Sequence, residues 1–267
     1  MLKREDFDKG LFLISGPCVM ESLDLLHEVG ETLKKIKDKT GATIIFKSSY
    51  DKANRTSLSG FRGPGLEKGL EWLKEIRETY GMPVLTDVHN EEEAKVAGEV
   101  VDIIQIPAFL CRQTDMVLAA CSTPAWVNIK KGQFLAPWDM TKVVEKAKSI
   151  SDRLLLTERG VSFGYNMLVT DMRSIPTMRE NGFPVIFDGT HSVQMPGGRG
   201  DSSGGDRRHV PTLSRAAVAA GADGLFWETH PSPDDALSDG PNMLFLDQVE
   251  KQFNCCRSIY DLVRKEG

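Results

Sequence analysis

Residues 23–57 read LDLLHEVGETLKKIKDKTGATIIFKSSYDKANRTS, and they contain the unit that decides the fold. Leu23–Lys39 places apolar residues at helical spacing, which predicts an amphipathic helix. Gly41 stands where such a helix would stop, and Thr43–Lys47 is a short, nearly continuous apolar run. Such runs are typical of parallel strands that are buried on both faces. The polar segment Lys47–Ser57 follows at the end of this strand.

The same unit recurs along the whole chain. The expected strands are Leu11–Ser15, Thr43–Lys47, Pro83–Asp87, Ile103–Ile106, Trp126–Ile129, Leu154–Thr157, Pro184–Phe187 and Gly224–Trp227. The expected helices are Leu23–Lys39, Leu66–Tyr80, Glu91–Val100, Thr114–Cys121, Met140–Ser149, Asp171–Asn181, Val210–Ala220 and Leu246–Arg264. This alternation predicts an α/β (β/α)₈ TIM barrel. Residues 1–267 are expected to form one domain, with 1–10 as a short N-terminal extension. A doubly wound open sheet is the alternative, and it is disfavoured because no glycine-rich dinucleotide turn is present.

Composition narrows the class of protein. The net charge of −5 argues against non-specific nucleic-acid binding, which needs a basic surface. Five cysteines without framework spacing indicate a reducing compartment. No apolar run has the length of a signal-peptide core or a membrane span. We therefore expect a soluble cytoplasmic protein that binds neither membrane nor nucleic acid.

Lys47–Ser57 combines Lys47, Lys52 and Arg55 with small hydroxyl side chains, a set that suits phosphate. In a barrel, chemistry lies at the C-terminal ends of the strands. Nearly every expected strand ends in an ionisable group here, which favours an enzyme.

Two groups of side chains are expected at this rim. The cations are Lys47, Lys52, Arg55, Lys130 and Arg159, which suit two anionic groups or two substrates. Cys18, His191, Glu228 and Asp239 supply one thiol, one imidazole and two carboxylates, a plausible set for Zn²⁺, Fe²⁺ or Mn²⁺. No pair of these four residues has the local spacing of a metal-binding motif. The prediction that they lie close together therefore depends on the barrel fold.

Eight motifs then carry a family resemblance. They are Gly16–Cys18, Lys47–Arg55, Ile104–Asp115, Lys130–Phe134, Glu158–Gly160, Phe163–Tyr165, Asp188–Ser192 and Glu228–Pro231. From about residue 11 onward the chain resembles the 3-deoxy-D-manno-octulosonate 8-phosphate synthases. The sister 3-deoxy-D-arabino-heptulosonate 7-phosphate synthases carry a Lys-Pro-Arg-Thr type of run where this chain has Lys52–Thr56. The resemblance therefore favours arabinose 5-phosphate over erythrose 4-phosphate as acceptor.

The resemblance implies that phosphoenolpyruvate, D-arabinose 5-phosphate and water give an eight-carbon sugar acid phosphate and inorganic phosphate, a step of lipopolysaccharide biosynthesis. It assigns substrate binding to Lys47, Ser49, Lys52, Asn54, Arg55, Thr56, Asp87, Gln105, Pro107, Ala108, Phe109, Arg112, Lys130 and Arg159. Lys130 and Arg159 would bind the phosphate of phosphoenolpyruvate, and Lys47, Ser49 and Gln105 would face its carboxylate. Asn54, Arg55 and Thr56 would hold the sugar phosphate.

The resemblance also implies four residues at the chemistry: Lys52, Asn54, His191 and Cys18. Lys52 would lie at the aldehyde. Arg112 would reach a neighbouring subunit's site, which implies a homotetramer. The implied cofactor is a divalent metal on Cys18, His191, Glu228 and Asp239, with no organic cofactor.

Two features leave alternatives open. The resemblance implies that family members with Cys at position 18 need a metal and that members with Asn there do not. In this chain Cys18 resembles the metal-dependent members, whereas Ser238–Met243 resembles the metal-independent members. A natural intermediate and an Asn-to-Cys engineered form both fit. Gly197–Gly205, within residues 196–206, is expected to form a mobile lid, with a disordered insertion as the alternative. The rival functions are the seven-carbon synthase, a non-catalytic sugar-phosphate-binding barrel and a metal-dependent aldolase.

Overall fold

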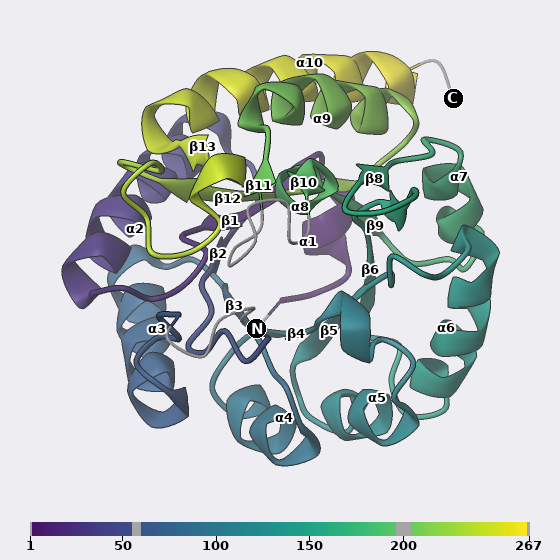
Figure 1. The fold of residues 1–267 in the computed structure, drawn as a ribbon, viewed down its shortest axis with the longest axis horizontal. Coiled ribbons are helices and arrows are strands. Elements are labelled where there is room, and N and C mark those ends of the chain that lie inside the picture. The colour runs from purple at the N-terminus through teal and green to yellow at the C-terminus, as the bar shows by residue number, and fades with distance from the viewer. Residues whose placement is uncertain (1, 55–59, 196–203, 266–267) are drawn as a thin grey trace.

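The computed structural model describes residues 2–54, 60–195 and 204–265. Its central feature is a closed barrel of parallel strands (Figure 1). In spatial order the strands are β1 (Phe12–Gly16), β2 (Ile44–Lys47), β3 (Val84–Asp87), β4 (Ile103–Ile106), β5 (Trp126–Lys130), β6 (Leu154–Glu158), β9 (Val185–Asp188) and β12 (Gly224–His230). Parallel pairing of β1 with β12 closes the ring. The predicted (β/α)₈ barrel is confirmed.

Helices surround the barrel and cover its outer face (Figure 1). They are α2 (Leu23–Thr40), α3 (Leu66–Tyr80), α4 (Glu91–Gly98), α5 (Thr114–Cys121), α6 (Met140–Lys148), α7 (Ser174–Arg179), α9 (Val210–Ala219) and α10 (Val249–Lys265). Gly41 and Gly81 end α2 and α3 in the left-handed conformation, as the helix-stop pattern predicts.

Two helices begin later than their sequence patterns predict. The Asp171 carboxylate accepts the backbone N–H of Arg173, and this local turn delays α7 to Ser174. Leu246–Gln248 forms the separate 3₁₀ turn η5, so α10 begins at Val249. Both differences arise at helix starts, where local turns compete with the helical pattern.

The N-terminal extension closes one end of the barrel. Its short helix α1 (Glu5–Asp8) buries Phe7 inside the barrel, against the rings of Phe12 and Trp126 at centroid distances of 5.2 and 4.7 Å. Apolar residues from the strands fill the interior around Phe7. Side chains therefore fill this end of the barrel, and the cavity described below opens at the opposite end, where the strands have their C-termini.

Additional short elements build walls at that other end. The hairpin β7 (Val161–Ser162)–β8 (Leu168–Val169) follows β6, and the hairpin β10 (Gln194–Met195)–β11 (Gly204–Gly205) follows the short helix α8 (Gly189–Ser192). After β12, the 3₁₀ turn η4 (Gly240–Asn242) leads into β13 (Leu244–Phe245), which pairs with β12. Among the described residues, no helix has both the length and the apolar character that crossing a bilayer requires.

Candidate active site

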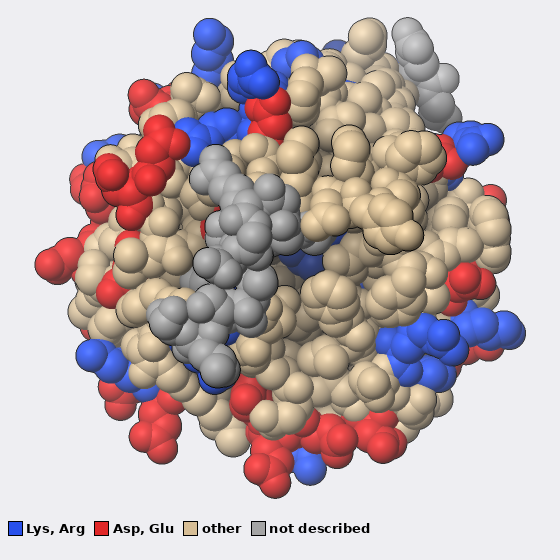
Figure 2. All heavy atoms as spheres, viewed as in Figure 1, with Lys and Arg blue, Asp and Glu red and all other residues tan. Residues whose placement is uncertain are grey.

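A cavity of about 1110 Å³ opens at the C-terminal ends of the strands. Figure 2 shows the opening near the centre of this face, with basic side chains at its base. The expected site residues in its lining are Lys47, Lys52, Asn54, Asp87, Gln105, Pro107, Ala108, Phe109, Lys130, Arg159, His191, Glu228 and Asp239. Strand ends that lie far apart in the sequence therefore converge on one space.

Other expected residues lie elsewhere. Cys18 is buried next to the cavity wall, and the buried Ser49 donates its hydroxyl hydrogen bond to Asp87. Arg112 is exposed on the turn before α5. Arg55 and Thr56 fall outside the described residues. So does the lid expected within 196–206, except for its last three positions.

On one side of the cavity, Lys47 and Lys52 face the same buried carboxylate. The Lys47 Nζ donates to Glu228 Oε1 at 2.5 Å and to the Cys18 carbonyl at 3.0 Å. Lys52 Nζ lies 3.8 Å from Glu228 Oε1. Burial by itself would lower the pKa of Lys52, but the charges of Glu228 and other nearby carboxylates raise it above its ordinary value. Lys52 is therefore a charged ammonium at neutral pH.

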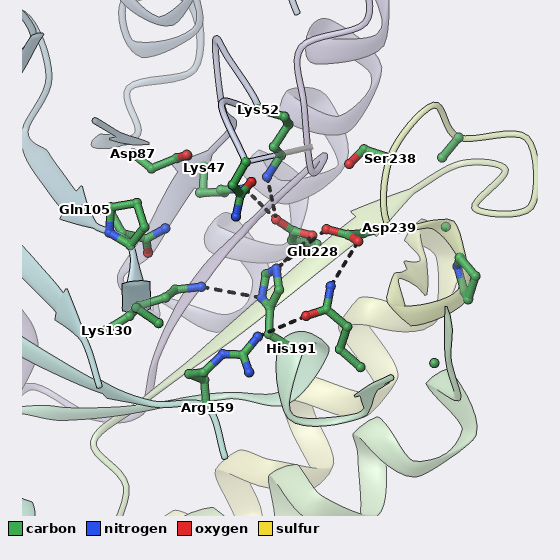
Figure 3. Close-up of a pocket in the computed structure, with 18 of the residues that line it drawn as sticks. Lys47, Lys52, Asp87, Gln105, Lys130, Arg159, His191, Glu228, Ser238 and Asp239 are labelled. Carbon is green, nitrogen blue, oxygen red and sulfur yellow. Dashed lines mark hydrogen bonds and ion pairs between the residues drawn. The ribbon is translucent and has the colours of Figure 1, made fainter. Parts of the chain in front are cut away.

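Lys130 and Arg159 form the other basic group (Figure 3). Lys130 Nζ donates to Asp188 Oδ2 at 2.5 Å and lies 3.8 Å from the centroid of the Phe226 ring. Arg159 is 4% exposed, and its Nη2 donates to Gln194 at 3.1 Å. Its Nη1 is buried without a hydrogen-bond partner among the described residues. A buried guanidinium with a spare donor is ready to bind an anion.

Three candidate metal ligands, His191, Glu228 and Asp239, lie between these basic groups (Figure 3), and the buried Cys18 lies beside Glu228 and Asp239. Ligand atoms of Cys18, Glu228 and Asp239 all lie within 4.8 Å of one another. His191 Nε2 lies 3.7 Å from Glu228 Oε2 and 3.9 Å from Asp239 Oδ2. Its other ring nitrogen faces Asp188 Oδ2 at 2.7 Å, the arrangement that orients a metal-binding imidazole.

Two observations test whether a cation fits here. Glu228 Oε2 is buried without a hydrogen-bond partner among the described residues. Burial by itself would raise the pKa of Glu228, but Lys47, His191 and Lys52 lower it well below its usual range, so the carboxylate stays ionised. An ionised carboxylate with a free buried oxygen, beside a thiol and an imidazole, suits a divalent transition metal. The residues fit the ion.

Without a cation the Cys18 thiol keeps its proton. Its Sγ lies within hydrogen-bonding distance of Ser238 Oγ at 3.1 Å and of Asp239 Oδ2 at 3.3 Å. Burial first, and then the Glu228 charge, raise the pKa of Cys18 well above its ordinary value. A bound cation reverses this preference and favours the thiolate.

The structure also brings in residues beyond the expected set of site residues. Asp188 accepts from both Lys130 and His191, and its place in Asp188–Ser192 was a visible signal. Gln194 bridges Arg159 and Asp239, and no sequence feature marks it. His89 links Asp87 to Glu93, at 3.2 and 3.0 Å.

The fold and the site together define a class of protein: a (β/α)₈ enzyme whose cavity suits anionic substrates beside a candidate metal centre. A family model described as the DAHP synthetase I family matches residues 5–263. The chain belongs to this family.

Relatives within the family are more specific. The chain is 59% identical over 239 residues to a protein of Nitratidesulfovibrio vulgaris, covering 89% of this chain and 88% of the relative. It is 57% identical over 261 residues to a protein of Stenotrophomonas maltophilia, covering 97% and 95%. A protein of Syntrophotalea carbinolica is 57% identical over 253 residues, covering 94% and 91%. Each is named 2-dehydro-3-deoxyphosphooctonate aldolase, another name for the synthase that the motifs resemble. The expected family is confirmed.

Proposed function

We propose that the protein condenses phosphoenolpyruvate with D-arabinose 5-phosphate and water, giving 3-deoxy-D-manno-octulosonate 8-phosphate and inorganic phosphate. The names of relatives that share more than half of its residues support this activity. One observation of the site carries it: Lys47, Lys52, Lys130 and Arg159 converge on a single cavity large enough for two substrates. The product would serve lipopolysaccharide biosynthesis.

Phosphoenolpyruvate is assigned to the inner part of the cavity. Lys130 and Arg159 bind its phosphate, and the Nη1 of Arg159, which has no hydrogen-bond partner within residues 2–54, 60–195 and 204–265, supplies a further donor. Gln105 accepts from Asn128 through its carbonyl oxygen at 3.0 Å, so its amide N–H groups are left to donate to the carboxylate beside Lys47. These contacts hold the enol carbon in one orientation.

The acceptor sugar is assigned to the outer part. Asn54, exposed at the cavity rim, together with Arg55 and Thr56, holds its phosphate. The enol carbon forms the new bond to the aldehyde carbon, and the aldehyde oxygen gains a proton. Water adds at the carbon that carries the phosphate and loses a proton. Phosphate then leaves with the electrons of the broken carbon–oxygen bond, and the hydroxyl group left on that carbon loses its proton to give the keto group. The charged Lys52 stabilises the negative charge that develops on the aldehyde oxygen.

Cys18, His191, Glu228 and Asp239 would hold a divalent metal, for which Zn²⁺, Fe²⁺ and Mn²⁺ are the candidates. When bound, such an ion supplies Lewis-acid polarisation of an oxygen atom. Asp188 fixes the imidazole of His191, and Lys47 fixes Glu228.

The protein is further proposed to form a homotetramer in the cytoplasm. Phe163, Tyr165 and Met167 on the β7–β8 hairpin are 68, 95 and 51% exposed, an apolar surface that suits contact with another subunit. The exposed Arg112 is available to such a neighbour. All five cysteines are free, as in a reducing compartment.

The test is an assay of phosphate release and of the keto-acid product. Phosphoenolpyruvate with arabinose 5-phosphate should give both, and erythrose 4-phosphate should react far more slowly. Comparable or faster turnover of erythrose 4-phosphate would favour the seven-carbon synthase. Carbon–carbon bond formation without phosphate release would indicate a simple aldolase. Absence of any product would favour a binding protein.

A further inference from the structure

Gln194 connects the two halves of the site. It lies on β10, which pairs with β11, and its side chain lines the cavity. Its Nε2 donates to Asp239 Oδ1 at 3.2 Å, and its Oε1 accepts from Arg159 Nη2 at 3.1 Å. Dashed lines leave Arg159 and Asp239 for these two bonds in Figure 3. One amide therefore joins a candidate metal ligand to a candidate phosphate-binding cation.

The chemistry of this bridge is specific to an amide. Asp239 needs a donor and Arg159 needs an acceptor, and a glutamine side chain offers one of each. The two hydrogen bonds together set the orientation of the amide. If the amide flipped, its oxygen would face the carboxylate and its N–H groups would face the guanidinium, and both hydrogen bonds would be lost. Both hydrogen bonds involve a charged partner, so each is stronger than an ordinary one.

Asp239 and Arg159 each have a second polar atom that does not bind Gln194. Asp239 Oδ1 holds the amide, while Asp239 Oδ2 lies in the cluster with Cys18 and His191. Arg159 Nη2 holds the amide, while Arg159 Nη1 is buried without a hydrogen-bond partner in the part of the chain that the structure describes. A ligand bound at either free atom restricts the side chain that carries it. This restriction passes to the other side chain through Gln194.

We propose that Gln194 is a positioning residue that couples cation binding at Asp239 to phosphate binding at Arg159. This inference rests on the proposed function for the identity of the two ligands. A cation that fixes Asp239 orients Gln194, which holds the Arg159 guanidinium ready for the anion. By linkage, the anion strengthens cation binding by the same factor.

The experiment uses Co²⁺ and inorganic phosphate as probes on the full chain. Co²⁺ affinity is followed by the thiolate absorption of a Co²⁺–Cys18 bond, and phosphate affinity is measured by calorimetry with and without Co²⁺. The variants are Gln194→Met and Gln194→Glu, with Gln248→Met as the matched control. Gln248 is exposed on η5 and lies outside the cavity. Thermal unfolding checks that each variant is folded.

In the wild type, Co²⁺ should tighten phosphate binding roughly 10-fold, a typical coupling between sites. In Gln194→Met the factor should fall to about 2-fold, the part that direct attraction between cation and anion supplies. Gln194→Glu adds a negative charge beside Asp239 and pairs with Arg159. It should bind Co²⁺ more tightly and phosphate more weakly, opposite shifts that a purely structural role does not produce. Gln248→Met should match the wild type.

Unchanged coupling in Gln194→Met, or parallel shifts in Gln194→Glu, would overturn the inference while the proposed function stands. If the wild type fails to bind Co²⁺ through Cys18, the metal assignment and this inference both fall. Loss of synthase turnover with intact coupling would overturn the proposed reaction alone.

Discussion

Arg159→Lys tests the assignment of the phosphate of phosphoenolpyruvate most directly. The substitution keeps one positive charge at the end of β6 but replaces the planar fork of donors with a single ammonium. In the free protein the buried Nη1 of Arg159 makes no hydrogen bond with the described residues, and an unsatisfied buried donor costs about 1–3 kcal/mol. The substitution relieves this cost but also removes the Nη2 hydrogen bond to Gln194, so the stability of the free enzyme should change little. The loss should be seen in binding.

The expected size of that loss follows from the contacts. A hydrogen bond to a charged group contributes about 1.5–3 kcal/mol, so losing one weakens phosphate binding roughly 10- to 150-fold. A phosphate concentration of 100 times the wild-type Kd stabilises the wild type by about 2.7 kcal/mol. If the Kd rises about 100-fold, the same concentration stabilises the variant by only about 0.4 kcal/mol.

The assay is thermal unfolding with and without inorganic phosphate, together with KM for both substrates. KM for phosphoenolpyruvate should rise while KM for arabinose 5-phosphate stays constant. Arg153→Lys is the matched control, because Arg153 precedes β6 at its other end and donates to the Thr123 carbonyl at 2.8 Å. Equal phosphate stabilisation of Arg159→Lys and the wild type would refute the assignment.

Three further perturbations test other parts of the site. Lys52→Met should lower kcat about 100- to 1000-fold, because it removes charge stabilisation of the aldehyde oxygen; a single-turnover rate equal to that of the wild type would contradict this. Treatment with a chelator should abolish most activity and Zn²⁺, Fe²⁺ or Mn²⁺ should restore it, whereas full activity in protein shown to be metal-free by elemental analysis would remove the metal from the mechanism. Burial by itself would lower the pKa of His89, but Asp87 and Glu93 raise it above its ordinary value. Its stabilising contribution is complete below the ordinary pKa and is lost as pH rises through the raised one. His89→Gln should flatten the dependence of unfolding free energy on pH in this window, and an unchanged profile would rule His89 out as its source.

Much of the barrel was predictable because its strands are buried on both faces. Ile103–Ile106 reads as a continuous apolar run, and the structure places β4 at the same residues. The role of the N-terminal extension was not predictable in this way. Phe7 gains its burial from the distant Phe12 and Trp126, and a four-residue helix carries little periodic signal.

The site was predictable where a side chain ends a strand. Lys47, Lys130 and Glu228 lie on strands whose C-terminal ends face one cavity, so barrel geometry alone brings them together. Gln194 was not predictable, because its partners Arg159 and Asp239 meet it only through loops of the folded chain. The sequence also could not predict how deeply each charged group is buried, and burial helps to decide which carboxylates remain ionised.

The turn after β12 bears on the mixed sequence pattern at Ser238–Met243. Asp239 has φ +49°, a left-handed conformation that Asp and Asn tolerate better than other non-glycine residues. A Cβ on Gly240 would lie 2.3 Å from the Pro233 carbonyl oxygen, so the turn also requires glycine there. This turn brings Asp239 to Cys18, and the segment that resembles the metal-independent type therefore still places a carboxylate at the candidate metal site.

Asp239→Asn separates the turn from the charge. Asparagine suits the left-handed conformation, so thermal stability should stay close to that of the wild type, whereas Asp239→Ala should lose stability because alanine does not. Removing the carboxylate from the cluster with Cys18 and Glu228 should weaken Co²⁺ binding by at least about 10-fold. If Asp239→Asn bound Co²⁺ as tightly as the wild type, Asp239 would be only a turn residue. Ser238–Met243 would then resemble the metal-independent members in function as well as in sequence, because its carboxylate would not contribute to cation binding.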